Sequence, residues 1–115
     1  MEENLDVPEV PHDNSFHSTG DWTEWKCPSD AFELIHARVK CLSPGINQYR
    51  IQFRNYNPHR VLVKSTASHI VGSGANDDAQ VPGGGGVSVL TRVPLRCGNV
   101  SSPEVFITID DVIRI

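Results

Sequence analysis

Six basic side chains fall at alternating positions of three segments that read as consecutive β-strands. Side chains two or four residues apart point to the same face of a strand. If these strands pair, the six would form one positively charged sheet face, which attracts an anionic partner. The residues of this expected basic face are Arg38, Lys40, Arg50, Arg54, Arg60 and Lys64.

The opposite charge is gathered at the start of the chain. The first 24 residues carry seven acidic side chains and no lysine or arginine, whereas the other 91 carry seven acidic and ten basic side chains. This split predicts an acidic extended arm over residues 1–24 and a mildly basic domain over residues 25–115. A disordered tail is the alternative, because a polar segment buries too little apolar surface to fold alone. The arm's expected contact residues are Leu5, Val7, Val10 and Phe16.

The other chemically active residues show no spacing typical of a catalytic or metal site. The five histidines include no pair at i, i+2 or i, i+4, the spacings that aim two imidazoles at one ion. Residues 74–78 offer oxygen ligands for calcium, and Asp110 and Asp111 could join them if the fold brings them together, but the loop lacks the alternating pattern of calcium loops. Ser73 is not in a G-x-S-x-G motif. We therefore expect no metal, no cofactor and no enzyme activity.

The elements that carry the basic residues are predicted from alternation of apolar and polar side chains. Residues 35–42, 48–55 and 60–65 each alternate with period two and are separated by turn residues, which predicts a meander of three antiparallel strands. One helical turn with Ser29 as its N-cap is expected before the first strand.

The second half of the domain is less regular. Residues 72–79 are predicted to be a loop, and the glycines at 83–86 a mobile hairpin loop. Residues 87–93 are expected to form a strand and residues 94–103 a connection. The last segment, residues 104–115, is the clearest strand, with a β-bulge expected at Asp110–Asp111, where two inward carboxylates would be costly.

These patterns together predict an all-β fold. The stretches YRIQFRNYNPHRVLVK, PGGGGVSV and VFITIDDVIRI resemble strands of an immunoglobulin-like or fibronectin-like module, and the likeness covers most of residues 31–115. The resemblance implies an antiparallel β-sandwich of about seven strands with an extended N-terminal arm, and it implies no function.

Three cysteines leave the redox state open. Cys27, Cys41 and Cys97 allow three single-bridge pairings with one thiol left over, or three reduced thiols. The chain has neither an apolar run long enough to span a membrane nor a signal-peptide pattern. It therefore stays inside a cell, is a processed chain, or leaves by another route, and an extracellular or particle-surface location is slightly favoured.

The charge split suggests a non-enzymatic structural or assembly module. In this hypothesis the acidic arm binds the basic face of a neighbouring copy or adds a strand to its edge, so the partner is a second copy or another protein. Nucleic acid is not expected, because the chain is acidic overall and only Tyr56 reads as a stacking residue.

Two alternatives compete with assembly. One is a secreted carbohydrate- or protein-binding accessory domain with Trp22, Trp25 and Tyr56 as stacking surfaces, although two residues three apart do not share a face of a regular strand. The other is an intracellular enzyme or inhibitor in which the arm is an autoinhibitory flap over the basic face.

Overall fold

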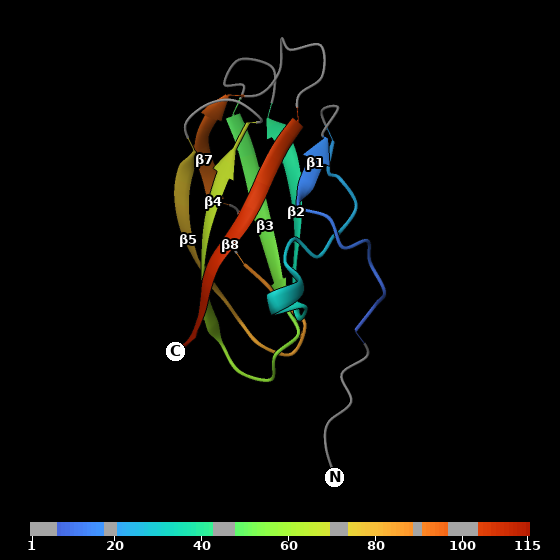
Figure 1. The fold of residues 1–115 in the computed structure, drawn as a ribbon. Helices are drawn as coiled ribbons and strands as arrows, with labels where there is room; N and C mark the ends of the chain where they lie inside the picture. Colours follow the sequence, from blue (N-terminus) through green and yellow to red (C-terminus); the bar gives the residue numbers. More distant parts are fainter. Residues whose placement is uncertain (1–6, 18–20, 43–47, 70–73, 89–90, 97–103) are drawn as a thin grey trace.

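The computed structural model describes residues 7–17, 21–42, 48–69, 74–88, 91–96 and 104–115 (Figure 1). Nearly all of its regular structure is β-strand. The elements in chain order are β1 (Ser15–His17), the 3-10 helix η1 (Asp30–Phe32), β2 (Ile35–Leu42), β3 (Gln48–Asn55), β4 (Val61–Ser68), β5 (Ala75–Val81), β6 (Gly86–Val87), β7 (Thr91–Arg96) and β8 (Glu104–Arg114).

The described residues form two four-stranded antiparallel sheets. One has the order β1-β8-β4-β5, and the other has the order β2-β3-β6 with β7 also paired to β3. The all-β, antiparallel prediction is therefore confirmed. The predicted bounds of β2 and β3, and their pairing, are confirmed as well.

The predicted meander is wrong at the step from β3 to β4, because these strands lie in different sheets. Asn55, at the end of β3, is fully buried and donates from Nδ2 to the carbonyls of His59 (2.8 Å) and Val81 (3.3 Å). Its Oδ1 accepts from the backbone N–H of Asn57 at 2.9 Å. These bonds hold the connection as an arch between the sheets, whereas the turn residues alone indicated a hairpin.

The glycine loop packs against this arch and joins β5 to β6, which lie in different sheets, so the predicted hairpin is wrong. Gly84 and Gly85 have positive φ angles of 69° and 87°, and their N–H groups donate to the carbonyls of Asn57 and Asn55, each at 2.8 Å. A Cβ at Gly83 would lie 2.7 Å from backbone atoms of Pro58 and His59. The glycines therefore permit a close backbone approach.

The prediction of a loop over residues 72–79 is also wrong for its described part. β5 begins at Ala75 and pairs with β4 along its whole length. It is an edge strand whose outward residues, such as Asn76 and Asp78, are exposed. Its apolar alternation is weak because two of its inward positions are Ala75 and Asp77, which are only half-buried. Charges on an edge strand also discourage further pairing.

Two local predictions are confirmed. Ser29 caps η1, with its side chain accepting from the backbone N–H of Ala31. The β4–β8 register shifts between Lys64 and Ser65, which pair with Asp111 and Ile109 and leave Asp110 as the extra, exposed residue of a bulge.

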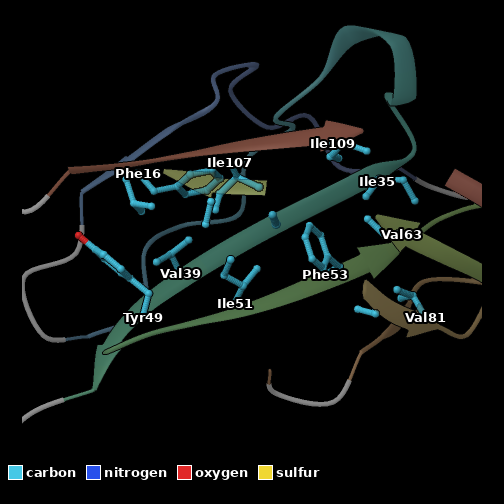
Figure 2. Close-up of a cluster of buried hydrophobic side chains, with 14 of the residues drawn as sticks. Phe16, Ile35, Val39, Tyr49, Ile51, Phe53, Val63, Val81, Ile107 and Ile109 are labelled. Carbon is cyan, nitrogen blue, oxygen red and sulfur yellow. The ribbon is translucent and has the colours of Figure 1, made fainter. Parts of the chain in front are cut away.

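One apolar core fills the space between the sheets. The inward residues of β2 and β3 alternate as predicted, and Figure 2 shows them with side chains from the other sheet. Phe16, from the expected arm, is among the largest fully buried side chains. The buried cluster is Phe16, Ile35, Ala37, Val39, Cys41, Tyr49, Ile51, Phe53, Val61, Val63, Ala67, Ala79, Val81, Val105, Ile107 and Ile109.

Replacing Phe16 by alanine should lower the free energy of unfolding by about 3–5 kcal/mol, because a large buried ring is lost and its cavity is closed only in part. Urea denaturation followed by circular dichroism measures this change. Val7→Ala, at an exposed position of the same segment, is the control and should change stability by less than about 0.5 kcal/mol. Equal, small effects of both substitutions would show that the segment is not part of the folded unit.

Candidate functional site

The N-terminal segment is bonded to both sheets of its own chain. The carbonyl of Pro11 accepts from the N–H of Cys27 at 2.9 Å, and the N–H of Asp13 donates to the carbonyl of Cys27 at 3.0 Å. After this contact the chain crosses to the other sheet, where β1 pairs with β8 and places Phe16 opposite Val105. The end of the expected arm is therefore built into the two-sheet body.

Polar side chains hold this crossing in place. Lys26 Nζ donates to the carbonyl of Ser15 (2.7 Å) and to Asp13 Oδ2 (3.3 Å), and lies 5.3 Å from the centroid of the Phe16 ring. The backbone N–H of Ser15 and the charge of Lys26 lower the pKa of Asp13. His12 Nδ1 lies 2.6 Å from Asp30 Oδ1. At least one carboxylate of the expected arm, that of Asp13, therefore pairs with a cation of its own chain.

The four expected arm contacts have different environments. Phe16 is in the core, Val10 is half-buried, and Val7 is 36 % exposed. Leu5 lies outside the described residues. Residues 7–12 line one side of a polar groove of about 620 Å³, and Glu33, Leu34 and His36 line the other.

Residues 23–26 extend the second sheet beyond β2. Thr23 N–H donates to the carbonyl of Val39 at 2.9 Å, and Lys26 exchanges two backbone bonds with Ala37 at 2.8 and 2.9 Å. Three residues of this segment therefore span two residues of β2, which is the count of a β-bulge. The extra residue changes the alternation and brings Trp22 and Trp25 to one face, against Arg38. In a regular strand, residues three apart would not share a face, so the irregular pairing is what places them together.

The two indoles alternate with cations on this face. The Arg38 guanidinium carbon lies 4.4 Å from the Trp22 ring centroid and 4.7 Å from that of Trp25. Arg54 lies 4.7 Å from the Trp25 centroid, and Lys40 Nζ lies 5.8 Å from that of Trp22. These are cation–π distances. Burial, together with the charge of Arg54, lowers the pKa of Arg38.

Four of the six expected basic-face residues share this face. Arg38 and Lys40 on β2 are in register with Gln52 and Arg50 on β3, and Arg54 follows on the same side. We call Arg38, Lys40, Arg50 and Arg54, with Trp22 and Trp25, the basic–aromatic face.

The other two basic residues belong to the opposite sheet. Lys64 is an exposed residue of β4 in register with Asp78 and Asp111. Arg60 is exposed and directly precedes β4. The six therefore do not form one surface, because the arch after β3 separates them.

The second surface of interest is the outer edge of β8. β1 pairs only with residues 104–106, and one further bond joins Ile107 N–H to the carbonyl of Asn14 at 2.9 Å. Among the described residues, no backbone group pairs with residues 108–115 on that side. Figure 1 shows β8 continuing past β1 toward the C-terminus. Ile113 and Ile115 are 39 % and 54 % exposed.

A groove of about 340 Å³ adjoins this open edge. Its apolar lining includes Phe32, Ile35 and Val112, and its basic lining is Arg114 and His59. It shares Glu33 and Leu34 with the groove beside the N-terminal segment. An exposed strand edge beside an apolar groove is the geometry that accepts an added strand.

Some of the side chains considered as calcium ligands lie close together between β5 and β8. Asn76, Asp78 and Asp110 line a common hollow with Lys64 and Ser65, so the fold does bring the calcium candidates together. Within the described ranges, however, no group of three or more histidine, cysteine, aspartate or glutamate side chains is arranged to hold a metal ion.

The cysteines differ in state. Cys41 is disulfide-bonded, whereas Cys27 is a buried free thiol whose Sγ lies 3.3 Å from the carbonyl of Ser29. Burial raises the pKa of the Cys27 thiol, which makes it a weak nucleophile. Cys97 lies outside the described residues. The alternative of three reduced thiols is therefore wrong.

No family model, no curated protein and no solved structure matches this chain. In the part of the chain that the structure describes, no helix is long and apolar enough to cross a membrane.

The burial of His36 leads us to expect that the free energy of unfolding decreases in acid. His36 is 3 % exposed, and its ring lies 5.1 Å from that of Tyr56. Burial, reinforced by the charges of His12 and Arg54, lowers the pKa of His36 below 6.5. The unfolded chain therefore binds this proton more readily, so the stabilisation from neutral His36 is complete above about pH 6.5 and is lost as the pH falls.

Replacing His36 by glutamine should flatten the decrease in unfolding free energy between about pH 7.5 and about pH 5. Urea titrations at several pH values measure this slope. His17→Gln, at an exposed position of β1, is the matched control and should keep the wild-type slope. Parallel curves for wild type and H36Q would contradict the assignment.

Proposed function

We propose that this protein is a non-enzymatic assembly module in which the acidic N-terminus of one copy adds as a strand to the open edge of β8 in another copy. The observation that carries the proposal is the edge over residues 108–115, with which no described residue pairs on that side, next to a groove lined by apolar residues, Glu33, His59 and Arg114. Exposed edges of this kind bind extended segments through backbone hydrogen bonds and side-chain pockets.

The described part of the N-terminal segment, residues 7–17, does not pair with this edge beyond Ile107, and the sequence supplies a reason. If β1 continued backwards in its observed register, Pro11 would pair with Asp110 and Glu9 with Val112. Pro8 and Pro11 have no N–H to donate to such a ladder. The segment instead leaves β8 at Asp13 and bonds to Cys27.

Residues 1–7, MEENLDV, contain no proline and match the open stretch in length and chemistry. In an antiparallel arrangement, Leu5 would lie beside Val112 and Glu3 beside Arg114. The groove would receive the apolar side chain, and the carboxylate would meet a guanidinium. Because donor segment and acceptor edge are different surfaces, such contacts join copies head to tail.

The finer architecture and the location are part of the same proposal. Two antiparallel sheets around one core, with chain crossings between them after β3 and after β5, support an immunoglobulin-like β-sandwich. The disulfide at Cys41 supports an oxidising setting, such as an extracellular or particle surface.

Deleting residues 1–6 tests the assembly. This deletion keeps Pro11 and Phe16, so the anchored segment and the core remain, whereas a deletion of residues 1–20 would remove them. Light scattering should show that the mass of the full chain rises with concentration and that the deleted chain stays monomeric. A full chain that remains monomeric at millimolar concentration, or an unchanged mass after deletion, would overturn the proposal.

Substitution of the acceptor edge provides a second test. Arg114→Glu should weaken self-association by about tenfold, because it places like charges together where one ion pair is expected. Arg60→Glu makes the same charge change at an exposed residue outside the groove lining and should leave association within about twofold. Equal effects of both substitutions would indicate general repulsion and count against the edge of β8.

A further inference from the structure

The basic–aromatic face is independent of the edge of β8, and its central cation, Arg38, is held by neighbouring side chains. Arg38 lies between two indoles and donates from Nε (3.0 Å) and Nη2 (2.6 Å) to Gln52 Oε1. Gln52 in turn donates to the carbonyl of Ser88 at 3.2 Å. A guanidinium ordered in this way loses little further entropy when it binds a ligand.

These cations have no counter-charge in the part of the chain that the structure describes. The ion pairs there are His12–Asp30 and Lys26–Asp13, and neither involves Arg38, Lys40, Arg50 or Arg54. The Nε atoms of Arg50 and Arg54 are buried and have no hydrogen-bond partner. Because these Nε atoms are covered by protein, an oxyanion would meet the exposed remainder of the two half-buried arginines, where a guanidinium can still donate to it.

The cations are arranged as a row. Lys40 and Arg50 are in register across β2 and β3, and the backbone register continues to Arg92 on β7. Along β3, Arg50 and Arg54 are separated by about 13 Å, from the rise of a strand. A row of cations on one sheet face is complementary to a linear ligand with repeated anionic groups.

We propose that the basic–aromatic face binds a linear polysaccharide carrying sulfate or carboxylate groups. Guanidinium groups bind both kinds of oxyanion through paired N–H donors. Trp22 and Trp25 are half-buried, and their remaining exposed surface offers apolar contact to the C–H faces of sugar rings. Single-stranded nucleic acid fits less well, because stacking of a base needs a whole open indole face and guanidinium groups lie 4.4–4.7 Å from both ring centroids. A sugar chain held by the cations needs only the partial contact that remains.

Calorimetry with the full-length protein tests this inference. The probes are heparin for sulfate, polygalacturonate for carboxylate, neutral dextran, and oligo-dT. Heparin, polygalacturonate or both should bind with micromolar affinity that weakens as salt is raised, and dextran should not bind. Whichever of the two binds identifies the anionic group. Failure of both, or tighter binding of oligo-dT, would overturn the proposal.

The double variant Lys40→Gln with Arg50→Gln should lower the affinity at least tenfold. Neither side chain lies between the two indoles, as Arg38 does, so we expect the double variant to fold. Thermal melting measures this. The matched control is Arg60→Gln with Lys64→Gln, which removes the same charge from the opposite sheet and should keep affinity within about twofold. An equal loss in both double variants would overturn the assigned face.

Two further measurements separate this site from the assembly. The chain lacking residues 1–6 should bind the polysaccharide with unchanged affinity, whatever its own oligomeric state. Binding should also change the tryptophan fluorescence, because both indoles of the chain lie on this face. Loss of binding on deletion, or unaltered fluorescence at saturation, would contradict the assignment.

Discussion

The burial of Phe16 between the two sheets is the contact on which the rest of the arrangement depends. It is carried by a strand of only three residues, and its ring lies in a cluster with residues from both sheets. Burying such a ring contributes about 1.5–3 kcal/mol, and the bonds of Pro11, Asp13 and Lys26 add to it. With the chain held there, residues 7–12 lie beside Glu33, Leu34 and His36, and no described residue pairs with β8 beyond Ile107 on that side.

Both surfaces of interest arise from irregularities in strand pairing. On the second sheet, one extra residue between Thr23 and Lys26 places Trp22 and Trp25 on the same side, where they enclose Arg38. On the first sheet, the early departure of the N-terminal segment leaves an edge that a longer β1 would have closed. A regular ladder in either place would have removed the feature, because alternation and pairing would both be complete.

Local structure was largely predictable from the sequence. Alternation identified β2, β3 and β8, and the two aspartates in sequence marked the bulge in β8. A serine before a short polar segment identified the cap of η1. β5 was missed because its first two inward positions are Ala75 and Asp77, which are only half-buried and give weak apolar alternation. The role of Asn55 was missed because its bond to Val81, which joins the two sheets, spans 26 residues of sequence.

The sequence by itself determined which residues face the core, since a period of two is a local property of each strand. It also determined the charge split and the places where proline prevents pairing. Only the tertiary structure decided which strands are neighbours, and therefore that Arg60 and Lys64 leave the basic face and that Trp22 and Trp25 join it. The physical reason is that sheet partners are chosen by packing across the whole core, whereas alternation specifies only the direction in which each side chain points.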